Sequence, residues 1–243
     1  MSRWTKDAFK WGRYKGQLIL LCVRWYLAFT LSYRQLERML REPGWAVDHR
    51  SIFRWVQRYG PELAARCRVF LKPTSRSYRT DETYIKVKGH DRYLYRAVDS
   101  SGPTIDFLLT AKRDKASAKR FFHRALRCLS NLSPRVINVD KNRAYPPAFQ
   151  ELKAEGVLSR RCRLRQCRFL NNVVEQDHRN VKRRIRLAMG YGSFRTAWRT
   201  IQGIEAMHLV GKGRVRRVPK HDVMAQVRFI HKLFGLAAEP QPI

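Results

Sequence analysis

Residues 83–110 read TYIKVKGHDRYLYRAVDSSGPTIDFLLT and carry the strongest fold signal in the chain. Runs rich in β-branched and aromatic residues occupy 83–87, 93–98 and 105–110. The segments KGHD and SSGP separate these runs, and their Gly and Pro residues favour tight turns. Because short turns join consecutive antiparallel strands, the sequence predicts a three-stranded meander here.

The pattern changes after the meander, because helical and strand-like segments then alternate. The spacing of Ala and Phe predicts a helix over 115–129, followed by a short strand over 135–139. A second helix is expected over 147–155, a short strand near 162–165, and a long basic helix from Asn172. This order predicts an α/β layer fold with a mixed sheet.

The segment before the meander predicts three helices, and the first of these is strongly apolar. Residues 18–31 read LILLCVRWYLAFTL, with Arg24 near the middle. A membrane-spanning helix needs about 20 largely uncharged residues. We therefore interpret this run as a core helix and expect no membrane partner.

The next two helices have clear start signals. Ser32 and Gln35 have the spacing of a capping box, so a helix is expected to begin near Tyr33. Asp48 is expected to cap a third helix that reaches about Tyr59. Two short helices with a tight connection indicate a helix-turn-helix, whose second helix would enter the major groove of DNA.

The third helix is expected to present a basic outer face and to end at Gly60-Pro61, before a further short helix over 62–70. The side chains expected on that face are His49, Arg50, Arg54 and Arg58. A plain three-helix bundle with solvated arginines is the alternative. The charge of the whole chain favours DNA contacts.

Changes in composition divide the chain into three parts. Lys72-Pro73-Thr74-Ser75 has the character of a linker. We expect an all-α helix-turn-helix domain over 1–72, an α/β domain over 73–213 and a C-terminal helical tail over 214–243.

The charge of the chain points to a polyanionic partner. It has 51 Lys and Arg against 19 Asp and Glu, a formal net charge of +32, although its 44% hydrophobic content is typical of a folded protein. The basic residues are spread along the chain with aromatic residues among them, which favours a long nucleic-acid footprint. Nucleic acid is therefore the expected partner.

The cysteines favour a reduced, intracellular protein. Five cysteines are an odd number, and no signal peptide is recognisable, so we expect no disulfides. Cys162 and Cys167 lack the spacing and companion ligands of a zinc site. The five are Cys22, Cys67, Cys128, Cys162 and Cys167.

Three carboxylates occupy notable positions in a chain that is poor in acids. Asp81 is expected at the entrance of the first strand, Asp140 directly after the fourth, and Glu175 in the first turns of the late helix. Two hard cations about 3.5–4 Å apart perform phosphodiester cleavage in nucleases, and such ions prefer carboxylate oxygen. These acids are the candidate ligands.

Other groups compete for these roles. Asp177 lies two positions after Glu175 and so points to a different side of the helix. His178 could act as a general base, but two-metal chemistry does not need one, so a solvated or packing histidine is the favoured interpretation. The remaining competing acids are Glu82, Asp99 and Asp106.

These residues and their surroundings resemble the DDE transposases with a ribonuclease-H-like core, and specifically the small bacterial transposases of the insertion-sequence-six group. The interval between Asp140 and Glu175 holds 34 residues, a spacing typical of the superfamily, and Lys182 lies seven positions after the Glu. The matching stretches include DETYIKVKG (81–89), YLYRAVDSSGPTIDFLLTAKRD (93–114), VDKNRAYPPAF (139–149) and LNNVVEQDHRNVKRRIR (170–186).

The resemblance implies a function and a set of residue roles. Asp81, Asp140 and Glu175 would bind two Mg²⁺ ions, for which Mn²⁺ would substitute, and catalyse cleavage and strand transfer. Arg179 and Lys182 would contact double-stranded DNA at the transposon end, since they share one helical stripe with Glu175. The resemblance also implies a replicative, cointegrate-forming route, a homodimer or larger assembly on paired ends, and a bacterial cytoplasmic location.

Alternatives remain open from the residues alone. Arg179 would otherwise form an ordinary surface ion pair with Glu175, and Lys182 would belong to a solvated basic run. A non-catalytic helix-turn-helix regulator would also explain the charge. A ribonuclease of the same fold would have no need of the amino-terminal helices.

Overall fold

The computed structural model describes residues 9, 14–100, 102–128, 130–167, 183 and 190–236. The chain folds as two compact units. A helical unit combines the chain up to Leu71 with the chain from Arg195 onward, and an α/β unit spans Lys72–Phe194.

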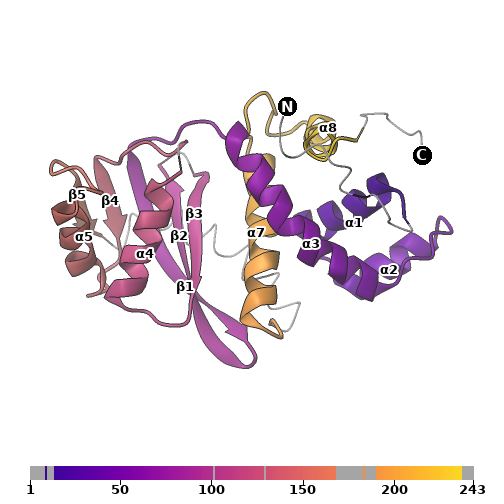
Figure 1. The fold of residues 1–243 in the computed structure, drawn as a ribbon, viewed down its shortest axis with the longest axis horizontal. Helices are drawn as coiled ribbons and strands as arrows, with labels where there is room; N and C mark the ends of the chain where they lie inside the picture. The colour runs from indigo at the N-terminus through magenta and orange to yellow at the C-terminus, as the bar shows by residue number, and fades with distance from the viewer. Residues whose placement is uncertain are drawn as a thin grey trace. The chain divides into compact units, whose positions relative to one another are not determined.

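The α/β unit is built on a five-stranded mixed sheet with the strand order β3-β2-β1-β4-β5 (Figure 1). Strands β1, β2 and β3 pair antiparallel, whereas β4 pairs parallel with β1, and β5 pairs parallel with β4. The bounds are Ser77–Val87 for β1, His90–Asp99 for β2, Thr104–Thr110 for β3, Val136–Val139 for β4 and Arg163–Gln166 for β5.

Two helices cover this sheet and bury an aromatic core. Helix α4 (Lys115–Leu126) packs on β2 and β3, and α5 (Tyr145–Ala154) packs against α4. Tyr95 of β2 contacts the ring of Phe121 in α4, and both side chains are buried. The meander, the mixed sheet and these helices confirm the expected ribonuclease-H-like α/β fold.

Strand β1 is longer than the sequence indicated, and this changes the setting of Asp81. The prediction began the strand at residue 83, whereas β1 begins at Ser77. Pairing with β2 on one side and β4 on the other satisfies the backbone of the polar residues before 83. Asp81 therefore lies inside the strand, and the prediction that it stands at the strand entrance was wrong.

The helical unit begins with three helices, and the predicted start signals of the second and third are confirmed. Ser32 accepts a hydrogen bond from the Gln35 amide at 3.1 Å, and the Gln35 side chain accepts one from the Ser32 amide at 2.7 Å. Asp48 accepts from the Ser51 amide at 2.8 Å. The helices are α1 (Gly16–Ala28), α2 (Tyr33–Arg41) and α3 (His49–Cys67), and a 3-10 turn, η1 (Arg68–Phe70), follows.

Helix α3 runs through Gly60 and Pro61, so the predicted helix end at this pair was wrong. The reason is tertiary packing against α7 (Phe194–Gly211). A Cβ on Gly60 would lie 3.4 Å from the Arg199 carbonyl oxygen, and one on Gly203 would lie 3.0 Å from the Gly60 Cα. Close approach of the two helices keeps α3 intact across a proline that removes one helical hydrogen bond.

The end of the chain packs with the first helices, which differs from the division expected from composition. Gln57 donates to the Thr200 hydroxyl at 2.8 Å, and Arg66 donates to the Leu233 carbonyl in α8 (Val223–Leu233). Ile204 and Ile230 join Val56 in one apolar core. Residues 195–213 therefore belong to the helical unit and not to the α/β unit.

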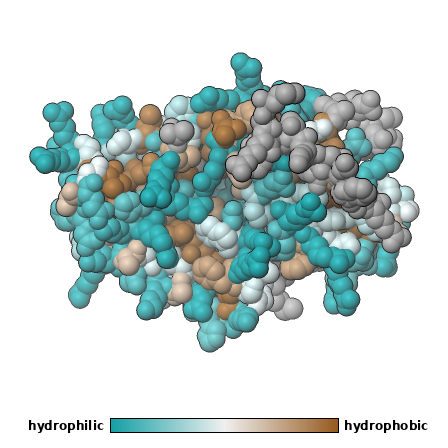
Figure 2. Space-filling model, in the orientation of Figure 1, coloured by the Kyte–Doolittle hydropathy of each residue, from teal (hydrophilic) through white to brown (hydrophobic). Residues whose placement is uncertain are grey.

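Across the part of the chain described here, every helix is too short or too polar to span a lipid bilayer. On the face shown in Figure 2, hydrophilic residues cover most of the surface, and apolar residues form small patches between them.

Candidate active site

Asp81 and Asp140 meet because β1 and β4 are parallel neighbours. Arg79 of β1 is paired with Asn138 of β4, and each aspartate lies two positions beyond its paired residue. Parallel strands advance by the same rise, so equal offsets bring two side chains to one level and one face of the sheet. The two carboxylates predicted from the sequence are therefore brought together by strand register.

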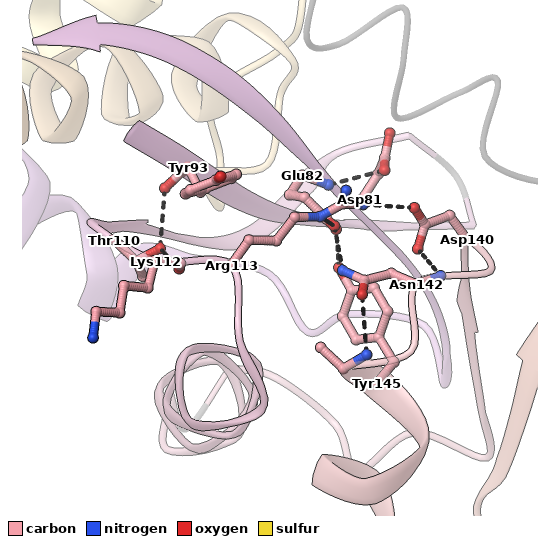
Figure 3. A network of polar contacts seen from close by, with 10 residues as sticks. Asp81, Glu82, Tyr93, Thr110, Lys112, Arg113, Asp140, Asn142 and Tyr145 are labelled. Atoms are coloured by element: carbon pink, nitrogen blue, oxygen red, sulfur yellow. Dashed lines mark hydrogen bonds and ion pairs between the residues drawn. The ribbon is translucent and has the colours of Figure 1, made fainter. Parts of the chain in front are cut away.

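An acidic cluster results, with Glu82 as its third member (Figure 3). One carboxylate oxygen from each of Asp81, Glu82 and Asp140 lies within 4.8 Å of the other two. Convergent carboxylate oxygens are the donors that hard divalent cations prefer. On donor chemistry, these residues fit a Mg²⁺ or Mn²⁺ site.

Glu82 differs from the two aspartates, because both of its oxygens are already engaged. Its side chain is only 1% exposed. Oε1 accepts from Arg113 Nε and, at 2.7 Å, from Asn142 Nδ2, while Oε2 accepts from the Tyr145 hydroxyl (Figure 3). A carboxylate bound to three donors has little lone-pair capacity left for a cation.

Tyr145 is suited to remain the donor in this contact. It is fully buried, and burial raises the pKa of Tyr145 well above its usual value, with the charge of Glu82 adding to the effect. The phenol therefore keeps its proton at neutral pH and donates it to the carboxylate.

Arg113 bridges the cluster. Its Nε binds Glu82, and its terminal Nη2 lies 3.1 Å from Asp140 Oδ2. Partial burial lowers the pKa of Arg113, but the charges of Glu82 and Asp140 outweigh it, so the pKa lies above its ordinary value. The guanidinium thus neutralises part of the negative charge in the cluster.

The aspartates retain access that Glu82 lacks. The Asp140 side chain is 27% exposed, and its Oδ1 accepts from the Asn142 amide at 3.0 Å. Asp81 is partly buried, and its Oδ1 accepts from the Glu82 amide at 2.9 Å. Asp81 and Asp140 are therefore better placed than Glu82 to offer oxygens to a cation.

The third predicted carboxylate and its neighbours fall outside the described residues. This applies to Glu175, Arg179, Lys182, Asp177 and His178. Two other competing acids have structural partners: Asp99 accepts from the Ser75 amide at 2.5 Å, and Asp106 pairs with Arg124 at 3.2 Å.

The four basic residues predicted for DNA contact lie in the first ten residues of α3. Arg50, Arg54 and Arg58 are exposed, as expected for an outer face. His49 is partly buried, and its Nδ1 lies 2.8 Å from Glu37 Oε2. This hydrogen bond is the largest of the influences that lower the pKa of Glu37. His49 therefore also ties α3 to α2.

Sequence reasoning missed Arg113, Asn142 and Tyr145, and treated Glu82 only as a competing acid. A signal was present, because Glu82 directly precedes the β-rich run 83–87 in a chain with few acids. A buried carboxylate requires a cation or several donors. Arg113 lies three positions after the third strand-like run and was quoted without a role.

Comparison with known proteins gives consistent results. A family described as the DDE domain matches residues 75–214. The chain is 36% identical over 204 residues to the transposase for insertion sequence-like element IS431mec of Staphylococcus aureus, covering 84% of this chain and 88% of the relative. It is 35% identical, with the same coverage, to the transposase for insertion sequence element IS257 in transposon Tn4003 of Staphylococcus aureus.

Among solved structures, the HTLV-2 integrase catalytic core domain in complex with magnesium matches at 23% identity and a TM-score of 0.36, covering 46% of this chain and 69% of that chain. The DDE-domain match spans more than half of the chain, and the staphylococcal transposases match over most of both lengths. This chain therefore belongs to the DDE transposases of the insertion-sequence-six group, which are enzymes that cleave and join DNA.

Proposed function

We propose that this transposase binds the ends of its insertion sequence, cleaves DNA phosphodiesters there and transfers the 3′-hydroxyl ends to target DNA. The observation that carries the proposal is the convergence of Asp81 and Asp140 at one level of two parallel strands. We assign these two residues and Glu175 as the metal-binding catalytic carboxylates.

The proposed cofactor is a pair of Mg²⁺ ions, with Mn²⁺ as a substitute. Bound divalent ions would neutralise phosphate charge, activate the attacking water or hydroxyl and stabilise the leaving oxygen. Asp81 and Asp140 contribute the oxygens and fix where that chemistry takes place. The Asp140 side chain is 27% exposed, which supports access of a DNA strand to its carboxylate.

The basic residues supply the binding surface. His49, Arg50, Arg54 and Arg58 are proposed to contact the transposon end from α3, and Arg179 and Lys182 to contact it beside the site. With a net charge of +32, the affinity for DNA depends strongly on salt. The family resemblance supports a replicative, cointegrate-forming route, a homodimer or larger assembly on paired ends, and action in the bacterial cytoplasm.

Metal-dependent nicking of a duplex that contains the insertion-sequence end tests this function. The full chain should nick it with Mg²⁺, and Asp140→Asn should lose at least a hundredfold in rate while still binding the duplex. Asp91→Asn is the matched control, because Asp91 pairs with Lys86 on the exposed β1–β2 hairpin, away from the cluster. Nicking by Asp140→Asn at the wild-type rate would show that Asp140 is not a catalytic residue, whereas absence of nicking by the wild-type chain would favour the non-catalytic regulator.

A further inference from the structure

The two aspartates lie beyond the stretch in which β1 and β4 pair with each other. The β1–β4 pairing covers Ser77 to Arg79 on one strand and Val136 to Asn138 on the other, and it stops there. Asp81 and Asp140 come two positions later. Strand register brings the two carboxylates to one level, but no β1–β4 pairing joins their own backbones, so side-chain contacts contribute to their separation.

Glu82 links β1 to the segment that follows β4. It follows Asp81 in β1 and accepts hydrogen bonds from Asn142 and Tyr145, which both come shortly after Asp140. The backbone amide of Asn142 also donates to Asp140, and the side-chain Oδ1 of Asn142 accepts from the Ala144 backbone amide at 3.0 Å. Glu82 thus holds the whole turn that carries Asp140 against the strand that carries Asp81.

Arg113 adds a cation to the same arrangement from a third part of the fold, after β3. A buried carboxylate such as Glu82 is costly without a positive partner, so the contact to Nε anchors the guanidinium. The other end of the guanidinium then contacts Asp140 Oδ2, an oxygen of the more exposed carboxylate. Arg113 therefore places its positive charge beside Asp140, where a bound divalent cation would also place its charge.

We propose that Glu82 is a positioning residue that sets the Asp81–Asp140 separation, and that Arg113 competes with the divalent cation for Asp140 while remaining anchored to Glu82. The proposal rests on the proposed function, since it assumes that Asp140 is a metal ligand. Glu82 is not itself a ligand in this arrangement.

The test measures Mn²⁺ binding to the full-length protein without DNA, from the electron paramagnetic resonance signal of free Mn²⁺. Arg113→Gln removes the competing cation and should tighten binding about tenfold. Glu82→Gln keeps an acceptor for Asn142 but leaves Arg113 to pair with Asp140 alone, so binding should weaken about tenfold. The Mg²⁺ concentration for half-maximal nicking should shift in the same directions.

The double variant Glu82→Gln/Arg113→Gln removes a buried ion pair as a unit and leaves no isolated charge, so it is the most secure folding control. Its Mn²⁺ affinity should return to within about threefold of wild type. Arg143→Gln, an exposed residue of the same turn, controls for the loss of one positive charge and should change binding less than Arg113→Gln.

The outcomes separate the two levels of inference. If Asp140→Asn binds Mn²⁺ as wild type does, the proposed metal site is wrong. If Asp140→Asn loses binding but Arg113→Gln fails to tighten it, only the competition by Arg113 is wrong. If the double variant binds no Mn²⁺, Glu82 is a ligand and not a positioning residue.

Discussion

Tyr145 donates its phenolic hydrogen to Glu82 and so joins the first turn of α5 to β1, 63 positions earlier in the chain. Both side chains are buried. This hydrogen bond connects β1 to the helix that follows Asp140, and its loss has a defined cost.

Tyr145→Phe leaves one oxygen of Glu82 without this donor in a buried site. A buried acceptor that loses its partner costs about 1–3 kcal/mol, so the free energy of unfolding should fall by that amount in urea. Tyr84→Phe is the control, because the Tyr84 side chain is 50% exposed and should change stability by less than about 0.5 kcal/mol. Equal effects of the two substitutions would contradict the role given to Tyr145.

Glu175→Gln keeps the size of the side chain but removes its charge. We predict that cleavage and strand joining fall by orders of magnitude while binding to the end duplex survives, and that Mn²⁺ restores a trace of activity. Asp177→Asn is the matched control, because a residue two positions on points to another side of a helix. Loss of activity in Asp177→Asn instead of Glu175→Gln would show that Asp177, and not Glu175, is the third carboxylate.

Arg50→Ala and Arg54→Ala should weaken binding of the full chain to the end duplex. Each lost phosphate contact makes the negative slope of log affinity against log salt less steep by about 0.9. The double variant should therefore reduce its steepness by about twice that amount. The full chain is required, because α7 and α8 complete the core of the helical unit. Lys153→Ala removes a cation from the α/β unit as control, and an equal effect there would point to non-specific charge.

Gly203→Ala places a methyl group 2.7 Å from Leu27 Cδ1 and 3.0 Å from Gly60 Cα. Overpacking of this kind costs about 1–3 kcal/mol, so thermal unfolding should move to lower temperature. Gly211→Ala in the same helix meets nothing within 4 Å and provides the control. If Gly203→Ala is no less stable than this control, α3 and α7 do not approach each other as closely at Gly60 and Gly203 as described.

Glu151 links α5 to α4 through Lys115 at 2.6 Å and Lys119 at 2.9 Å. Hydrogen bonds from these lysines lower the pKa of Glu151 from 4.5 to about 2. A depressed pKa stabilises the fold above the unfolded value of 4.5, and this contribution is lost as the pH falls toward 2.

Glu151→Gln should therefore show a flatter fall of the thermal midpoint between pH 4.5 and pH 2 than wild type does. The exposed Glu42→Gln controls for the loss of one negative charge. A Glu151→Gln curve parallel to wild type through this window would show that the lysine contacts contribute no stability in solution.

Local signals in the sequence predicted the elements that depend on near neighbours. The capping residues Ser32 and Asp48 act within three positions of themselves, so their helix starts followed from spacing. The strands of the meander followed from β-rich runs between turns. Asp140 was recognisable as a candidate site residue because it directly follows an apolar strand.

Partners distant in the chain decided what the sequence could not. Helix α3 crosses Pro61 because α7, about 140 positions later, packs against Gly60, and β1 extends to Ser77 because β4 pairs with it. Such contacts override local propensity, since packing and ladder hydrogen bonds outweigh the preference of single residues.

The sequence by itself determined the α/β class, the basic helical start and the identity of two carboxylates that converge, because strand periodicity, charge and spacing are local properties. Only the tertiary structure decided that Glu82 is buried beside them and that Arg113 joins it to Asp140. These contacts join residues 31 and 27 positions apart, and no local pattern encodes which donors will meet a buried carboxylate.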